Sequence, residues 1–96
     1  MSNSRSDLAV SRRDDRYELR DGDELLSFAS YSETDGVVVV PYVETQVQHR
    51  GNGYSSMLMA GVVDDLRARQ MRIDARCWVA REYVTGLDDA DELMAR

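Results

Sequence analysis

The chain has 96 residues and a formal net charge of −6 at pH 7, which argues against a nucleic-acid partner, because phosphate binding requires clustered positive charge. All 12 basic residues are arginine, which excludes both Schiff-base chemistry on a lysine and phosphate binding by a P-loop lysine. One cysteine and one histidine allow no internal disulfide and leave a metal site short of ligands.

The N-terminal residues 1–14 combine dispersed charge with only a short apolar patch, Leu8-Ala9-Val10. We expect them to form a flexible tail before a single domain over residues 15–96. A domain of this size buries roughly 60 to 65% of the surface of its unfolded chain. Any functional site should therefore be an open groove rather than a closed chamber.

The next segment has the pattern of a β-hairpin. Residues 16–20 alternate polar and apolar side chains, Asp21-Gly22-Asp23 supplies turn residues, and residues 24–31 can form the second strand. A second turn is expected over residues 32–36.

Residues 37–40 are four successive valines, which place apolar side chains on both faces of a sheet and indicate a central strand. Pro41 lacks an N–H group and predicts a bulge or break before the chain continues through residues 42–47. A strand interrupted in this way would open a gap beside its neighbour.

The segment after residue 53 has apolar side chains at helical spacing, which predicts a helix over Tyr54–Arg69. Residues 72–76 are expected to form a strand parallel to the valine strand, with Cys77 at its carboxyl end. Residues 78–84 and 88–95 are expected to form two short helices. The expected core includes Trp78, Met57, Met59 and Met71.

The loop Gln48-His49-Arg50-Gly51-Asn52-Gly53 stands between an expected strand and the expected helix. Glycines let a backbone turn so that several N–H groups converge on one anion, and the following helix start is electropositive. These features predict a phosphate-binding loop. A Rossmann unit would place a third glycine where Ser56 stands, and too few residues follow Asp74 to complete its sheet.

The pattern Gln48-x-x-Gly51-x-Gly53 resembles the acetyl-CoA pyrophosphate motif of the GNAT superfamily of N-acetyltransferases. Glu44 precedes the loop, and Cys77 is followed six residues later by Tyr83, as in very small stand-alone GNAT-like proteins. The resemblance covers residues 16–84. It implies an α/β fold: the minimal acyl-CoA N-acyltransferase fold, with a twisted mixed sheet, a crossing helix and short C-terminal helices.

The resemblance also implies that acetyl-CoA is the cofactor. Its pantetheine arm would enter a split between two parallel strands and bond to the backbone of residues 45–47, and its diphosphate would bind the amides of residues 48–54. Asn52 stands where the family often has a basic residue, and Thr85-Gly86 where a His-Pro pair often follows the tyrosine. The candidate cofactor-binding residues are Thr45, Val47, Gln48, His49, Arg50, Gly51, Asn52, Gly53, Tyr54, Ser55 and Ser56.

Three residues are candidates for catalysis. Cys77 is either a nucleophile that accepts the acetyl group or a buried thiol that lines the thioester pocket. Tyr83 either protonates the departing CoA thiolate, as a tyrosine does in many family members, or packs in the core. Glu44 either accepts a proton from the amine or is a solvated carboxylate.

These features predict an acetyl-CoA-binding N-acetyltransferase that acts on an amine, either a small molecule or a protein segment. The alternative is an acyl-CoA-binding or interaction module with little or no turnover. The sequence has neither a signal peptide nor an apolar run of about 20 residues, so we expect a cytoplasmic protein without a membrane partner. It leaves the oligomeric state open.

Overall fold

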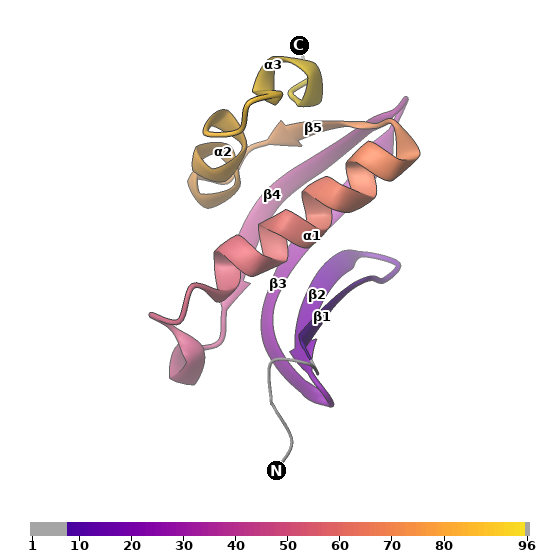
Figure 1. Ribbon diagram of the computed structural model, residues 1–96. Helices are drawn as coiled ribbons and strands as arrows, with labels where there is room; N and C mark the ends of the chain where they lie inside the picture. The colour runs from indigo at the N-terminus through magenta and orange to yellow at the C-terminus, as the bar shows by residue number, and fades with distance from the viewer. Residues whose placement is uncertain (1–7, 96) are drawn as a thin grey trace.

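The computed structural model of the protein describes residues 8–95. Within them, five strands form one sheet in the order β1-β2-β3-β4-β5, which α1 crosses (Figure 1). The elements are β1 (Leu8–Arg12), β2 (Arg16–Asp21), β3 (Glu24–Thr34), β4 (Val37–Thr45), the 3-10 turn η2 (Val47–His49), α1 (Tyr54–Arg69), β5 (Arg72–Ala75), α2 (Trp78–Thr85) and α3 (Ala90–Leu93).

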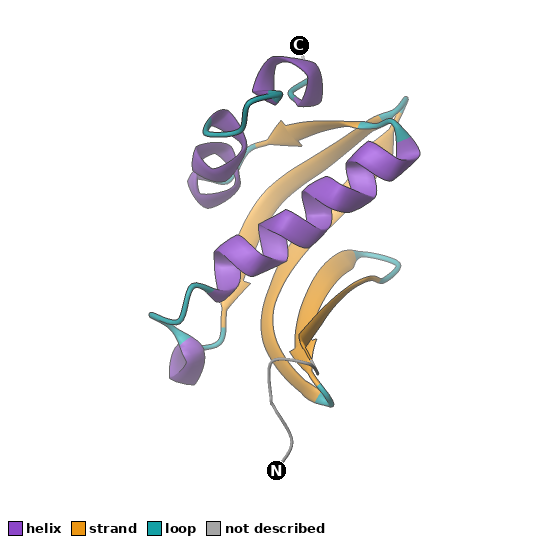
Figure 2. Ribbon diagram, in the orientation of Figure 1, coloured by secondary structure: helices purple, strands orange, loops and turns teal. Residues whose placement is uncertain are grey.

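Strands β1 to β4 pair antiparallel, whereas β5 runs parallel to β4. The connection from β4 to β5 runs through α1, as a parallel pairing requires. The sheet is strongly curled around this helix (Figure 2). The expected fold class, a twisted mixed sheet with a crossing helix and short C-terminal helices, is confirmed.

Strand β1 corrects the expected extent of the N-terminal tail. Residues Leu8–Arg12 pair with β2 along their whole length, so the expectation of a flexible segment over residues 1–14 is wrong for this part. Leu8 and Val10 pack against the hydrophobic core, and this apolar contact explains why the segment joins the sheet. Residues 1–7 lie outside the described part of the chain.

The expected interruption of the valine strand is a β-bulge at Pro41. Ser32 pairs with Val39 and Ser30 pairs with Tyr42, so Val40 and Pro41 both lie opposite Tyr31. The bulge reverses which face of the sheet the side chains occupy, because an extra residue shifts the two-residue alternation by one.

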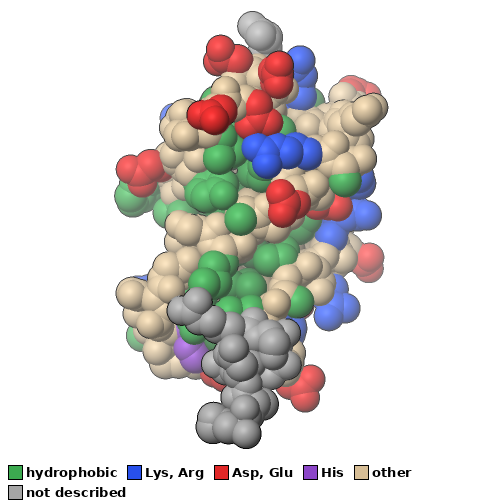
Figure 3. Space-filling model, in the orientation of Figure 1, with side chains coloured by type: hydrophobic (Ala, Val, Ile, Leu, Met, Phe, Trp, Pro, Cys, Tyr) green, Lys and Arg blue, Asp and Glu red, His purple; other side chains and the backbone are tan. Residues whose placement is uncertain are grey.

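The core lies between the sheet and α1. Helix α1 buries Leu58, Met59, Val62, Val63 and Leu66. Opposite them lie buried side chains of the sheet: Tyr17, Leu19, Leu26, Ala29, Val38, Val40 and Ile73. Within residues 8–95, the other face of the sheet carries no helix (Figure 1). Across the face that carries α1, acidic side chains gather over the C-terminal helices (Figure 3).

The C-terminal segment differs from expectation in two respects. Trp78 was expected in the core, but 69% of it is exposed, because it occupies the first position of α2. The expected helix over residues 88–95 is limited to α3, after which Met94 forms a parallel bridge with Ile73. The backbone of the last described residues thus extends the sheet beside β5. No helix within residues 8–95 is both long and apolar enough to cross a membrane.

Candidate functional site

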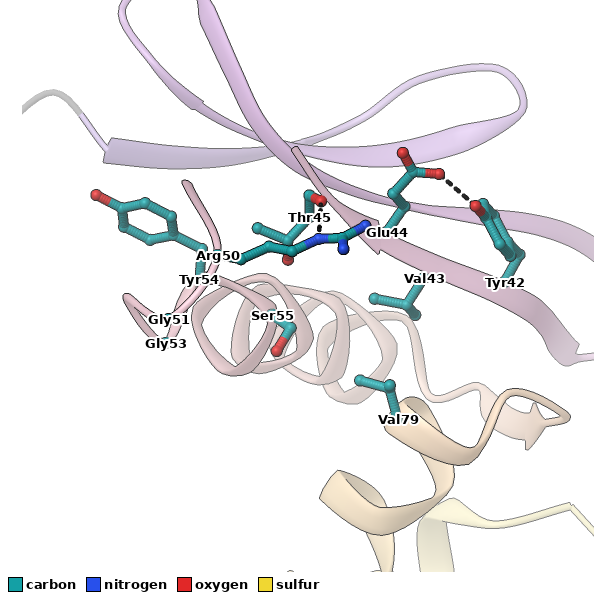
Figure 4. A pocket seen from close by; sticks show the side chains of 10 residues that line it. All are labelled: Tyr42, Val43, Glu44, Thr45, Arg50, Gly51, Gly53, Tyr54, Ser55 and Val79. Atoms are coloured by element: carbon teal, nitrogen blue, oxygen red, sulfur yellow. Dashed lines mark hydrogen bonds between the residues drawn. The ribbon is translucent and has the colours of Figure 1, made fainter. Parts of the chain in front are cut away.

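A cavity of about 330 Å³ lies where the glycine loop, the start of α1, the end of β4 and the start of α2 meet (Figure 4). Arg50 extends from the loop across the cavity towards β4, while Val43 and Val79 face each other from β4 and α2. The lining residues are Tyr42, Val43, Glu44, Thr45, Arg50, Gly51, Gly53, Tyr54, Ser55 and Val79.

The cavity exists because β5 leaves β4 halfway along. Pairing between these strands ends at Val40 and Ala75, where the carbonyl of Val40 accepts hydrogen bonds from the amides of both Arg76 and Cys77. Beyond this point β4 continues to Thr45, whereas the chain after β5 turns into α2. The carboxyl half of β4 therefore has a free edge.

The free edge presents the backbone of Val43 and Thr45. The Gln46 amide donates to Leu26 of β3 at 2.9 Å, and the Glu44 carbonyl accepts from Ser27 of β3 at 2.8 Å. Because bonding directions alternate along an antiparallel pair, the polar groups of Val43 and Thr45 point away from β3. The Thr45 carbonyl already accepts a bond from Arg50 Nε at 3.3 Å. The edge can bind an extended chain as a further strand would.

The second half of the loop before α1 has amides that lack a protein acceptor within residues 8–95. Gly51 and Gly53 have φ angles of 87° and 76°, in the left-handed region that favours glycine, and nothing lies within 4 Å of a β-carbon built on either. Among residues 8–95, no protein acceptor bonds the amides of Gly51 through Ser56. The first turn of α1 has neither an acidic residue nor a capping side chain. An anion here would find free donors and an uncompensated positive helix end.

Among the described residues, two charged side chains line the cavity. Arg50 of the loop is the cationic one, and Glu44 of β4 is the acidic one. The Tyr42 hydroxyl donates a hydrogen bond to Glu44 (Figure 4). This bond, aided by desolvation, raises the pKa of Tyr42.

A second cavity of about 180 Å³ adjoins the first, since Ser55 and Val79 line both. Its other lining residues are Ser56, Met59, Glu82 and Tyr83. The two cavities form a trough between the first turns of α1 and α2. Tyr83 thus lies on the far side of the trough from Glu44, which borders the first cavity only.

Several residues expected in the cofactor site line neither cavity. Val47 lies in η2 and is 72% exposed, and Gln48 and His49 belong to the same turn. His49 Nε2 lies 2.6 Å from a carboxylate oxygen of Glu24, and Asn52 donates to the His49 carbonyl at 3.0 Å. In the structure, His49 and Asn52 therefore shape the loop.

Cys77 also lies outside both cavities. It occupies the N-cap position of α2, is half-buried and packs against the core. Its carbonyl accepts a hydrogen bond from the Arg81 amide at 2.9 Å. The three candidate catalytic residues thus occupy separate places: Glu44 borders the first cavity, Tyr83 the second, and Cys77 neither.

Tyr42, Val43 and Val79 line the first cavity but were not expected there. The bulge at Pro41 explains two of them. Val38 and Val40 point into the core. Without the extra residue at the bulge, the alternation of side chains along the strand would also direct Tyr42 and Glu44 into the core. After the bulge, Val43 instead packs towards the core and Tyr42 is 49% exposed. Proline within the strand was the available signal for this change of face.

Comparisons with known proteins give a family match and a similar fold. A family model described as GCN5-related N-acetyl-transferase matches residues 16–93. The chain is also similar to an NMR structure of a GCN5-like protein from Staphylococcus aureus, described as a candidate N-acetyltransferase, with a TM-score of 0.64 and 18% identity. That similarity covers 94% of this chain and 90% of the other, and it concerns the fold alone. A comparison with curated proteins found no match.

Proposed function

Since the chain belongs to the GCN5-related N-acetyltransferase family, we propose that it binds acetyl-CoA in the trough between α1 and α2 and transfers the acetyl group to an amine. Acetyl-CoA is the typical cofactor of this family. The acceptor is a small molecule or a segment of a protein.

The observation that carries the proposal is the run of unbonded amides from Gly51 through Ser56, with Arg50 beside it. A diphosphate needs several donors and positive charge in one place, and the loop and helix start offer both. On binding, Arg50 would exchange its bond to the Thr45 carbonyl for a stronger, charge-assisted bond to phosphate. Ser55 and Ser56 lie in the first turn of the same helix.

The pantetheine arm would then run along the free edge of β4. Its two amide groups can pair with the backbone of Val43 and Thr45 as a strand would, while Val79 covers the chain from α2. This path differs slightly from the expected one over residues 45–47, because β4 ends at Thr45 and Val47 belongs to η2. The thioester would lie deep in the split, close to the bulge.

In the proposed reaction, the nitrogen of the amine forms a bond to the thioester carbonyl carbon, and the carbon–sulfur bond breaks. Glu44 accepts a proton from the amine, directly or through water. Tyr83 protonates the CoA thiolate, so the products are the acetamide and CoA thiol. Cys77 packs beside the site as a thiol without forming an acetyl intermediate, in line with its position outside both cavities.

The alternative is an acyl-CoA-binding or interaction module with little or no turnover. The separation of Glu44, Tyr83 and Cys77 favours it, because catalysis needs groups that act on one reacting centre. The two functions share the cofactor and differ in chemistry. Only a measurement of acetyl transfer therefore distinguishes the acetyltransferase from the binding module.

A thermal-shift experiment with CoA, acetyl-CoA, NADH and ATP in parallel tests the binding step. A ligand that binds the folded state raises the melting temperature as its concentration exceeds its dissociation constant. We expect the two CoA compounds to do so more strongly than NADH or ATP. Equal stabilisation by all four, or by none, would contradict a dedicated CoA site.

Incubation of the protein with labelled acetyl-CoA and a panel of amines then tests transfer. An acetylated amine formed at a rate proportional to protein concentration supports the acetyltransferase. Saturable binding of acetyl-CoA without any product across the panel supports the binding module.

A further inference from the structure

His49 is the shielded residue of an otherwise exposed loop segment, residues 47–53. Every residue of this segment is exposed except His49, whose side chain is 19% exposed. The segment projects beyond the end of β4 (Figure 1). Since a shielded polar side chain normally has a hydrogen-bond partner, the His49 ring is expected to contact groups outside the loop.

The ring of His49 contacts the two elements that flank the loop. Its Nε2 lies 2.6 Å from a carboxylate oxygen of Glu24, the first residue of β3. The ring also makes a T-shaped contact with that of Tyr54, the first residue of α1, with 6.0 Å between the ring centres. Tyr54 in turn lines the first cavity. One side chain thus connects the sheet to the helix start where the free amides lie.

Few other bonds tie the loop segment to the sheet. Among the described residues, two side-chain bonds reach from the segment to a strand: His49 to Glu24, and Arg50 Nε to the Thr45 carbonyl at 3.3 Å. If Arg50 turns to a diphosphate, its bond to Thr45 is lost. The bond between His49 and Glu24 is then the one that holds the loop to the sheet.

The loop needs such a contact because its glycines allow many backbone conformations. Gly51 and Gly53 have φ angles of 87° and 76°, which their free forms leave as readily as they adopt them. Ordering a flexible loop at the moment of binding costs affinity. The Asn52 side chain donates to the His49 carbonyl at 3.0 Å, so fixing His49 also restrains the second half of the loop.

We propose that His49 is a positioning residue: paired with Glu24, it holds the loop in the conformation that binds the diphosphate of acetyl-CoA. The inference rests on the proposed function, because the ligand is the cofactor assigned there. It also predicts that a proton on His49 strengthens cofactor binding. A histidine changes charge between about pH 5 and pH 8, and a charged ring makes a stronger hydrogen bond to a carboxylate than a neutral one.

The charged groups around the ring favour this effect. The titratable and charged groups of the elements that meet His49 are a phenol, a guanidinium and three carboxylates: Tyr54 of α1, Arg50 of the loop, and Asp21, Asp23 and Glu24 of the β2–β3 hairpin. Asp21 lies opposite Glu24 in the strand register. Arg20 pairs with Leu25, so its side chain lies on the other face of the sheet. Because carboxylates outnumber cations here, the surroundings attract a proton on the ring.

Isothermal titration calorimetry with acetyl-CoA at pH 6 and pH 8 tests the inference on the wild type, His49→Gln and Glu24→Gln. We expect each substitution to raise Kd about fivefold at pH 6, the upper range for one partly exposed ion pair, and less than about twofold at pH 8. Comparison with the wild type at each pH cancels the titration of the ligand's own phosphates. The double variant should lose no more than either single one, because both substitutions break the same bond.

The sign of the Glu24→Gln effect is diagnostic. Removal of a negative charge near the loop should, by long-range attraction alone, tighten the binding of an anionic ligand, so weaker binding indicates loss of a specific contact. Asp23→Asn is the matched control: it removes the neighbouring carboxylate and keeps the backbone carbonyl that accepts a bond from Arg20. Its affinity should be unchanged or slightly higher. Unchanged or tighter binding in Glu24→Gln at pH 6, or an equal loss at both pH values, would overturn the inference.

A measurement without cofactor separates this inference from the proposed function. Nitrogen-15 relaxation of the free protein reports fast backbone motion, and the order parameters of residues 50–53 should fall in His49→Gln and Glu24→Gln but not in Asp23→Asn. Unchanged amide signals outside the loop show that each variant is folded. If the wild type binds acetyl-CoA and both variants bind it equally well, the role of His49 is wrong and the proposed cofactor stands. If the wild type does not bind acetyl-CoA, the proposed function fails, and lower order parameters still show that the pair holds the loop.

Discussion

Gly61 of α1 packs directly against Val10 of β1. A β-carbon placed on this glycine would lie 2.5 Å from the valine Cβ, closer than atoms of two side chains approach. The contact requires a glycine for its small size rather than for its backbone angles, and it brings the edge strand onto the helix.

Gly61→Ala should therefore destabilise the protein. Alanine favours the helix by about 1 kcal/mol, but overpacking costs about 1 to 3 kcal/mol, so we expect a net loss of about 1 kcal/mol in the free energy of unfolding. Urea denaturation followed by circular dichroism measures it. In a double-mutant cycle with Val10→Gly, which also removes the Cβ, the double variant should be more stable than the sum of the single changes predicts. Additive effects would show that the two residues do not interact.

The same contact shows why the N-terminal boundary could not be predicted from the sequence. The pattern around Leu8 and Val10 is too short to indicate a strand by itself, and Gly61, against which Val10 packs, lies far along the chain. By contrast, the hairpin, the valine strand and α1 follow from local periodicity and turn residues, and all were predicted.

In the candidate site, too, features with a local sequence signal were predicted, whereas features that depend on strand pairing were not. The glycine loop could be found because glycines and a helix start are local signals. Gly51, Gly53, Tyr54 and Ser55 line the first cavity, and their role in cofactor binding stays a prediction. Tyr42 could not, because the face it occupies depends on how β3 pairs across the bulge. The sequence predicted the bulge but not its effect on each side chain beyond it.

Gly51→Asp should abolish stabilisation by acetyl-CoA. The substitution adds a negative charge beside the free amides and forces a side chain onto a residue with a φ angle of 87°. The backbone strain itself should cost about 1 to 2 kcal/mol of stability. Thermal-shift titration with acetyl-CoA measures the loss of binding.

Gly36→Asp is the matched control for this strain. Gly36 has a φ angle of 81° and, like Gly51, open space around a built β-carbon, but it lies in the turn between β3 and β4. Both variants should lose similar intrinsic stability, and only Gly51→Asp should lose the response to acetyl-CoA. A full response in Gly51→Asp would show that the loop does not bind the diphosphate.

Tyr83→Phe should lower kcat by roughly 100-fold if the phenol protonates the CoA thiolate, because general acids contribute roughly 10² to 10⁴ in rate. KM for acetyl-CoA should change little, since the aromatic ring that lines the second cavity is kept. Steady-state kinetics with a primary amine measures both constants. Tyr31→Phe serves as a control, because the Tyr31 hydroxyl bonds to the Arg13 carbonyl at 2.6 Å and lines neither cavity of the trough. An unchanged kcat in Tyr83→Phe would favour a solvent proton or the binding module.

The last prediction concerns the ion cluster around the buried carboxylate of Glu18, on the face of the sheet away from α1. Glu18 is only 5% exposed and bonds to Arg16, Arg20 and Arg13 at 2.7, 2.9 and 3.3 Å. The bond from Arg20, which outweighs the effect of burial, and the bond from Arg16 lower the pKa of Glu18 to about 2. Because the pKa is lower in the folded state, ionised Glu18 stabilises the fold at pH values above about 4.5, and this contribution is lost as the pH falls towards about 2.

Glu18→Gln should accordingly cost about 1 to 3 kcal/mol at neutral pH, since it removes charge-assisted hydrogen bonds to the arginines. The difference in unfolding free energy between wild type and variant should shrink as the pH is lowered from about 4.5 to about 2. Urea denaturation at a series of pH values measures this difference, and the comparison cancels the titration of Glu33 and Asp89, whose pKa values their arginines also lower. A difference that stays constant over this range would mean that the Glu18 carboxylate titrates alike in the folded and unfolded chains, and that its arginines do not hold it ionised.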